Sequence, residues 1–244
     1  NSFCTLLPAA EPMAATDGRD GRDTAEYLEE LLARDPANPY VHYRAGNFYA
    51  RAAPPHGDTE RAREHYRAAV RHHAGFGDAW NSWGLLDLIE AGKLGKGKKG
   101  RDLGLDDENA RRRVALLNAA KQSFERGVAV TKAQTGFTYF SGLKNLARAH
   151  AELGETDEAV ALLRRIVAED PLNAAAKWNL ADMLLGMMPR SEAVIAEAKQ
   201  QLEAAIAVDS SLVEAFVSLA DVFERFSAPP NPALARSMLE AAVA

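Results

Sequence analysis

The sequence has a single cysteine, no long hydrophobic run and few aromatic residues. One cysteine, Cys4, excludes an intrachain disulfide and a zinc site of several cysteines, and it fits a reducing compartment. No apolar stretch approaches the roughly 20 residues that a helix needs to cross a bilayer, so we expect no transmembrane segment. An excess of basic residues is missing too. The net charge of -5 argues against nonspecific binding of nucleic acid.

The first residues carry no lasting periodicity. Residues 1–23 are punctuated by Pro, Gly and Asp, and we expect them to form a flexible N-terminal arm. The chain begins at Asn1 rather than Met, which leaves a removed targeting sequence open. A cytoplasmic and an organellar location therefore both remain open.

From Thr24 onward, apolar residues return every three or four positions, which is typical of helices. The clearest unit is the 34-residue stretch "FSGLKNLARAHAELGETDEAVALLRRIVAEDPLN", from Phe140 to Asn173. Gly154 is placed to make its turn, and Pro171 breaks the chain before the next unit. The residues expected to line its two helices are Leu143, Leu146, Ala147 and His150 in the first, and Ala159, Leu163 and Ile166 in the second.

This unit resembles a tetratricopeptide (TPR) repeat, whose small residues at positions 8 and 20 let two helices approach closely. The same template recurs four times, with the small pairs Gly46 and Ala62, Gly84 and Ala120, Ala181 and Ala198, and Ala220 and Ala235. A lone helix, "TAEYLEELLARDPAN", comes before them. The resemblance implies an all-α fold: a right-handed α-solenoid of about five stacked antiparallel helix pairs plus a leading helix, forming one domain over residues 24–244.

The stretch "AGKLGKGKKG", residues 91–100, nearly spells the phosphate-binding pattern G-x-x-x-x-G-K-[ST]. The segment before it has a helical pattern, whereas a phosphate-binding loop follows a strand. Lys99 also stands where the Mg²⁺-binding Ser or Thr belongs. We therefore interpret Gly92 as a helix C-cap and residues 92–106 as a basic inserted loop. This loop is either a plain solvated turn or a contact for a partner, through Lys93, Lys96, Lys98, Lys99 and Arg101.

The sequence also offers few combinations of residues that could bind a metal or catalyse a reaction. His65 and His72 are seven residues apart, which is wider than usual for two histidine ligands on one helix, and we interpret them as surface residues. No set supplies an acid, a base and a nucleophile together. The sequence therefore predicts no enzyme activity, no metal site and no cofactor.

In the resembled family, positions 2, 5, 9 and 12 of each first helix face a concave groove. The residues so mapped are Tyr40, Tyr43, Asn47 and Ala50; Asp78, Asn81, Leu85 and Leu88; Ser141, Lys144, Arg148 and Ala151; Ala175, Trp178, Asp182 and Leu185; and Glu214, Val217, Asp221 and Glu224. Trp178 would be an aromatic anchor for a partner in this groove, whereas Trp80 and Trp83 occupy packing positions. The clamp that some relatives use for chaperone C-terminal tails agrees at only one position, Asn47, which argues against that ligand.

The resemblance thus implies a noncatalytic protein-interaction scaffold that binds a peptide or protein segment in its groove. The alternative is a structural or assembly subunit embedded in a larger complex. The last helix, "PALARSMLEAAVA", keeps an apolar side, whereas solenoids usually end in a polar capping helix. We therefore expect self-association through the C-terminal helix, or its burial against another chain.

Overall fold

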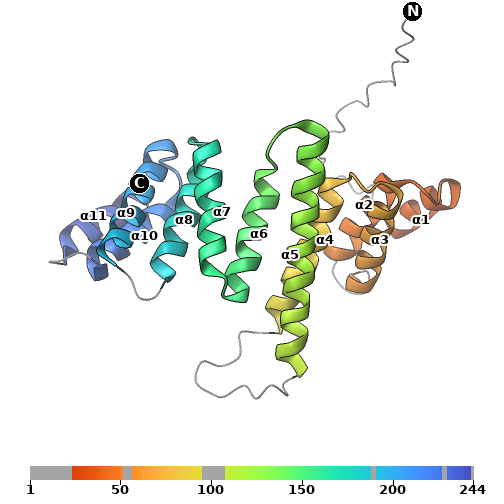
Figure 1. Ribbon diagram of the computed structural model, residues 1–244, viewed down its shortest axis with the longest axis horizontal. Coiled ribbons are helices and arrows are strands. Elements are labelled where there is room, and N and C mark those ends of the chain that lie inside the picture. The colour runs from red at the N-terminus through yellow and green to blue at the C-terminus, as the bar shows by residue number, and fades with distance from the viewer. Residues whose placement is uncertain (1–23, 52–56, 95–107, 188–190, 227–229, 243–244) are drawn as a thin grey trace, which may run out of the picture. The chain divides into compact units, whose positions relative to one another are not determined.

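A computed structural model describes residues 24–51, 57–94, 108–187, 191–226 and 230–242. Within these ranges the backbone is helical, with turns between the helices and no strand (Figure 1). None of the described helices combines the length and the apolar character that crossing a membrane requires. The arm predicted for residues 1–23 lies outside the described ranges.

The contacts divide the chain into two compact units, residues 1–74 and 75–244. Unit 1 contains α1 (Ala25–Arg34), α2 (Pro39–Arg51) and α3 (Thr59–His72). Side-chain caps start two of these helices: the Thr24 hydroxyl accepts from the backbone N–H of Tyr27, and the Asp58 carboxylate accepts from two N–H groups in the first turn of α3. Such caps satisfy donors that the helix itself leaves without partners.

The core of unit 1 lies between α2 and α3. Its buried residues include Ala45, Tyr49, Ala62 and Tyr66. A Cβ added at Gly46 would lie 2.6 Å from the Tyr66 ring, so the absence of a side chain there lets the two helices approach. This is the small residue that the repeat pattern assigned to the first helix pair.

Unit 2 contains the remaining helices as antiparallel pairs that follow one another along the chain. They are α4 (Gly77–Lys93) with α5 (Glu108–Thr135), α6 (Phe140–Leu153) with α7 (Thr156–Glu169), α8 (Ala174–Gly186) with α9 (Glu192–Val208), and α10 (Val213–Asp221) with α11 (Pro232–Ala241). A turn of π-helix, η1 (Val222–Phe226), extends α10. The all-α solenoid of helix pairs predicted from the sequence is confirmed.

Small residues bring the paired helices of unit 2 together. Ala147, Ala159, Ala181 and Ala198 are all buried, and they belong to one continuous hydrophobic cluster with the larger side chains around them. In the first pair, a Cβ on Gly84 would lie 2.7 Å from the Phe124 ring. Burial of this kind contributes about 25 cal/mol per Å² of apolar surface removed from water.

One boundary differs from the sequence interpretation. Helix α4 does not end at Gly92 but runs to Lys93 and is capped by Leu94, because Gly92 keeps helical dihedrals rather than the left-handed ones of a C-cap. Helix α5 has 28 residues, against 14 in α7. The single domain predicted for residues 24–244 remains a prediction.

Candidate functional site

The first helices α6, α8 and α10 of unit 2 carry an outward stripe opposite their buried side. In α6, Ser141, Lys144 and Arg148 are exposed, whereas Leu143 and Ala147 are buried. Spacings of three and four residues place a stripe on one side of a helix. The sequence therefore determines locally which side of α6 faces outward.

The stripe of α8 is mixed. Asp182 is exposed, while Trp178 and Leu185 are half-buried and pack against the hydrophobic cluster. The Trp178 indole Nε1 donates a hydrogen bond to the Ser218 hydroxyl of α10 at 3.2 Å. Trp178 therefore links the neighbouring first helices α8 and α10. Part of its ring remains accessible, but the side chain does not project freely from the surface.

The stripe of α10 is acidic and apolar. Glu214 and Val217 are exposed, Val217 at 48%, and Asp221 pairs with Arg225 at 3.1 Å. We call the outward surface of α6, α8 and α10 the first-helix face. Its residues are Ser141, Lys144, Arg148, Ala175, Trp178, Asp182, Glu214, Val217 and Asp221, together with Glu224 of η1, which extends α10.

On α4 the mapped residues mainly hold the next first helix. The Asn81 side-chain oxygen accepts from the Asn145 amide of α6 at 3.0 Å, and the Asp78 carboxylate accepts from the Tyr139 hydroxyl at 2.7 Å. Leu85 is half-buried against the cluster that contains Leu88. Leu88 is itself buried, only 2% exposed, so assigning it to a groove was wrong: the end of α4 packs against both α5 and α6.

Apart from Asp221, the charged residues of the first-helix face have no internal partners. Among the described residues, Lys144, Arg148, Asp182 and Glu214 make no ion pair or side-chain hydrogen bond. The second helices behave differently, since Arg164 of α7 forms two hydrogen bonds of 2.7 and 2.9 Å with Glu197 of α9. Unpaired charges on one face are available to a partner.

Ion pairs also join α5 to the pair that follows it. The Lys121 ammonium contacts both carboxylate oxygens of Glu155 at 3.0 Å, and the His150 Nδ1 atom lies 2.6 Å from the same carboxylate. The hydrogen bond from Lys121, assisted by that of His150, holds the pKa of Glu155 below its ordinary value. These contacts fasten the turn between α6 and α7.

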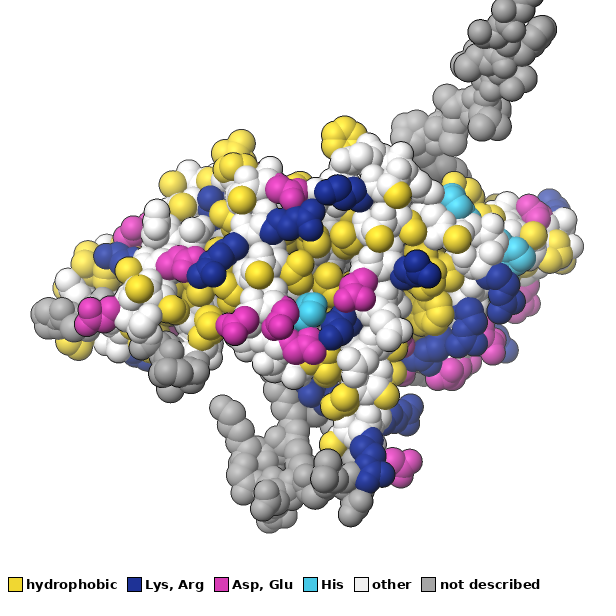
Figure 2. All heavy atoms as spheres, viewed as in Figure 1, with side chains coloured by type: hydrophobic (Ala, Val, Ile, Leu, Met, Phe, Trp, Pro, Cys, Tyr) yellow, Lys and Arg dark blue, Asp and Glu magenta, His cyan; other side chains and the backbone are white. Residues whose placement is uncertain are grey.

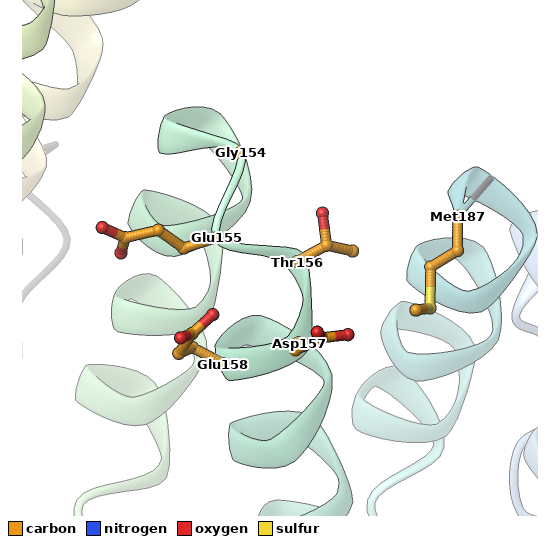
Figure 3. Close-up of a pocket in the computed structure, with 6 residues that line it drawn as sticks. All are labelled: Gly154, Glu155, Thr156, Asp157, Glu158 and Met187. Carbon is orange, nitrogen blue, oxygen red and sulfur yellow. The ribbon is translucent and has the colours of Figure 1, made fainter. Parts of the chain in front are cut away.

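A shallow hollow of about 290 Å³ lies beside this turn. Its acidic residues are Glu155, Asp157 and Glu158, and Met187 faces them from the end of α8. Figure 3 shows that Asp157 points toward Met187, whereas Glu155 points away from it. Since the carboxylates do not converge and Glu155 is already bound, the hollow has no arrangement that would hold a ligand.

A second hollow, of about 500 Å³, lies between α4 and α5. The rings of Trp80 and Trp83 line it and stack on each other, with their centroids 5.6 Å apart. Both side chains are half-buried rather than buried. The sequence assigned them packing positions, but it did not indicate that they would pack on each other.

In unit 1, the predicted groove residues lie on α2. Tyr40 is 57% exposed, and its ring meets His73 edge-on, while Tyr43 is half-buried beside Tyr66. The Asn47 side-chain oxygen accepts a hydrogen bond of 2.8 Å from the Tyr66 hydroxyl, and burial raises the pKa of Tyr66. Asn47 thus stabilises the helix pair.

Histidines of α2 and α3 form a cluster that the sequence did not predict. The Nδ1 atoms of His42 and His65 lie 3.1 Å apart, and the His42 ring stacks on His72. The His42 Nε2 atom lies 3.0 Å from the Pro36 carbonyl oxygen. No group of three or more His, Cys, Asp or Glu residues in the described ranges is arranged to hold a metal ion.

The basic loop is mostly outside the described residues. Lys93 is exposed in the last turn of α4, whereas Lys96, Lys98, Lys99 and Arg101 fall within 95–107. A phosphate-binding loop follows a strand, but here a 17-residue helix precedes the basic stretch. A role of these lysines in partner contact remains a prediction.

Comparison with known proteins gives the family of the repeats. Models of the tetratricopeptide repeat match residues 13–75 and 140–183. A search of curated proteins finds no match.

Solved structures share the fold at low sequence identity. YrrB, described as a TPR protein with an unusual peptide-binding site, is 16% identical with a TM-score of 0.57, over 90% of this chain and 92% of its own. A thermophilic TPR protein of Thermus thermophilus, TTC0263, is 17% identical with a TM-score of 0.57, over 80% and 87%. PilW, a type IV pilus biogenesis factor, is 16% identical with a TM-score of 0.57, over 89% and 79%.

Proposed function

The chain belongs to the tetratricopeptide repeat family, and on that premise we propose that it is a noncatalytic scaffold that binds an extended protein segment along its first-helix face. The fold supports a protein–protein interaction scaffold in general terms. The choice of surface is our own inference. It rests on the side chains that α6, α8 and α10 present.

One observation carries this choice: the first-helix face combines unpaired charges with accessible apolar surface. Lys144, Arg148, Asp182 and Glu214 have no partners within the described chain, and Val217, 48% exposed, lies on α10 one turn from Glu214. Residues that serve only the stability of a solenoid tend to be paired or buried, whereas a binding surface needs apolar contact with charged groups around it. The peptide-binding site attributed to YrrB is consistent with a role of this kind.

Site-specific crosslinking tests the proposal. A photoreactive benzoylphenylalanine replaces Val217 on the first-helix face, and in a matched control it replaces Glu125, an exposed residue of α5. In extracts of the source cells we expect the Val217 probe to crosslink a partner protein that the Glu125 probe does not. Adding Arg148→Glu should abolish that crosslink. Equal crosslinking from both positions would contradict the proposed surface.

A second candidate function, an assembly subunit, draws on α11. Leu234 and Leu239 of this helix are 41% and 47% exposed, and burying such side chains is favourable by roughly 1.5–3 kcal/mol each. Self-association would cover them. Light scattering of the purified chain and its Leu239→Glu variant tests this candidate: a larger species that becomes monomeric supports it, and an unchanged monomer contradicts it.

The basic loop calls for an experiment of its own. Affinity purification with mass spectrometry, comparing the intact chain with one lacking residues 93–105, measures whether any partner depends on it. Loss of one partner with retention of the others would assign a contact to the loop. An unchanged partner list would leave it as a solvated turn.

A further inference from the structure

The unpaired charges of the first-helix face are segregated by sign. Lys144 and Arg148, both on α6, are basic. Asp182 on α8, Glu214 on α10 and Glu224 on η1 are acidic. All five side chains are exposed, and none has an ion pair or side-chain hydrogen bond within the described residues.

The second helices lack this segregation. There, opposite charges lie beside each other and neutralise one another, as Arg164 with Glu197 and Lys121 with Glu155 do. Figure 2 shows acidic and basic side chains interleaved over α5 to α9 on the side that it displays. Separation of charge is therefore a property of the first-helix face rather than of the whole surface of unit 2.

The two charged ends lie a short peptide apart. Packed helices stand roughly 10 Å apart, and α8 comes between α6 and α10 in the order of first helices, so the two charged ends are at least about 20 Å apart. An extended chain advances about 3.3 Å per residue, so about six residues span that distance. Trp178, half-buried on α8, lies between the two ends, and the exposed side chain of Val217 lies on α10, one turn from Glu214.

We propose that the first-helix face binds an extended protein segment of fixed charge order. Its acidic residues meet Lys144 and Arg148, and its basic residues, about six positions away, meet Glu214 and Glu224. An apolar side chain between them contacts Trp178 and Val217. This inference rests on the proposed function and adds the chemistry and the direction of the bound segment.

Each end suits its counterpart chemically. The Arg148 guanidinium can hold a carboxylate through two parallel hydrogen bonds, and Lys144 adds a second positive charge one helical turn away. Because successive side chains of an extended segment point to opposite sides, only every second residue meets the face. Segments with the opposite charge order would place like charges together, which costs affinity and gives specificity.

Selection from a displayed library of random ten-residue peptides tests the inference with the full chain as bait. We expect the enriched peptides to carry acidic and basic residues separated by about six positions, in one constant order. Exposed ion pairs are individually weak. Reversing Lys144 and Arg148 to Glu turns attractions into repulsions, and we expect it to weaken binding of the selected peptides roughly tenfold.

A charge-inverted chain provides the sharpest comparison. It carries Lys144→Glu and Arg148→Glu together with Glu214→Lys and Glu224→Lys, so that its net charge is unchanged. Selection on this chain should enrich peptides with the opposite charge order. A control chain with Arg112→Glu and Glu125→Lys, both exposed positions of α5, should select the original order.

The outcomes separate the two proposals. Peptides that are enriched without charge order, yet lose binding on Val217→Asp, would overturn the fixed charge order and leave the binding face in place. Peptides whose binding ignores every substitution on α6 and α10, or a failure to enrich any peptide, would overturn both proposals. Circular dichroism of each variant verifies that its helices remain folded.

Discussion

At the scale of single residues, Gly84 and Gly92 show how one helix uses the same residue type for different reasons. Both lie in α4. A Cβ on Gly84 would lie 2.7 Å from the Phe124 ring and 3.0 Å from the Ala120 carbonyl oxygen, whereas a Cβ on Gly92 would meet nothing within 4 Å. Gly84 therefore allows α4 and α5 to pack closely, and Gly92 has no such role.

Alanine substitution at these two positions should change the free energy of unfolding in opposite directions. Gly84→Ala forces the fully buried Phe124 ring or the helix axis to move, and we expect it to destabilise the protein by about 1–3 kcal/mol. Gly92→Ala is the matched control, and better helix propensity should stabilise it by up to about 1 kcal/mol. Urea unfolding followed by circular dichroism measures both. A stabilised Gly84→Ala would contradict the close packing described here.

The histidine pair of unit 1 restricts where protons lie. A carbonyl oxygen can only accept, so His42 Nε2 donates to Pro36, and a neutral His42 must then accept at Nδ1. The Nδ1 atom of His65 is therefore the donor of the contact between the two rings. Protonating both rings would bring two donors together, so the pair accepts at most one extra proton without breaking this contact.

We expect unit 1 to lose stability as the pH falls below about 6.5. Burial, with His42 next, lowers the pKa of His65; Arg61 also lowers it, while Glu64 and Glu29 act in the opposite direction. The unfolded chain thus takes up a proton at a pH where the folded one does not, so the free energy of unfolding decreases toward acid.

Urea unfolding at pH 7.5 and 5.5, followed by NMR signals of α2 and α3, measures this pH dependence. The His65→Phe variant keeps an aromatic ring against Tyr49, on which His65 stacks, but it cannot titrate. Its stability should change less between the two pH values. Equal changes in both chains would show that His65 is not responsible.

At the scale of helices, α5 is fastened to α6 by a largely buried ion pair. The Arg113 guanidinium contacts the Glu152 carboxylate, and the two side chains are 16% and 24% exposed. The Arg113 Nε atom is buried without a hydrogen-bond partner. Removing the carboxylate alone would leave the guanidinium charge partly buried and uncompensated.

Comparison of a single and a double variant should show this dependence. We expect Glu152→Ala to destabilise the protein by about 1–3 kcal/mol, and the double variant Arg113→Met with Glu152→Leu to destabilise it less than that single change. Thermal or urea unfolding measures each variant. A double variant that is destabilised as much as Glu152→Ala, or more, would contradict this expectation.

Helix positions were predictable where the signals are local. Phe140–Leu153 and Thr156–Glu169 match the unit found in the sequence, and Gly154 ends the first of them with a left-handed φ of 84°. The burial of Leu88 was missed because it depends on α6, which lies far along the chain.

The candidate face was predictable to a similar degree. Repeat spacing alone places Lys144, Arg148 and Asp182 outward, as the structure has them. Spacing says nothing about pairing, however, so it could not distinguish these free charges from the paired ones of α7 and α9. It also could not predict the bond from Trp178 to Ser218, which are 40 residues apart.

At the scale of the whole molecule, unit 2 is a linear array of helices in which sequence neighbours pack on each other. Each helix packs mainly against those before and after it in sequence, so cooperative coupling passes from one pair to the next. A local destabilisation should therefore fade with distance along the array instead of loosening all helices equally.

Hydrogen exchange of the Gly84→Ala chain measures this attenuation. We expect the largest loss of protection in α4 and α5, a smaller loss in α6 and α7, and little change in α9 to α11. The unsubstituted chain provides the reference for each peptide. Uniform loss of protection through α11 would instead indicate that unit 2 unfolds as a single cooperative body.

The length of α5 has a practical consequence. Its 28 residues make a rod of about 42 Å, twice that of α7, and residues 108–112, ahead of the Arg113–Glu152 ion pair, include none that is buried. A rigid helical fusion could be spliced into this start of α5 to enlarge the particle for electron cryomicroscopy. Because the splice is on a second helix, the particle could be imaged while its first helices hold whatever they bind.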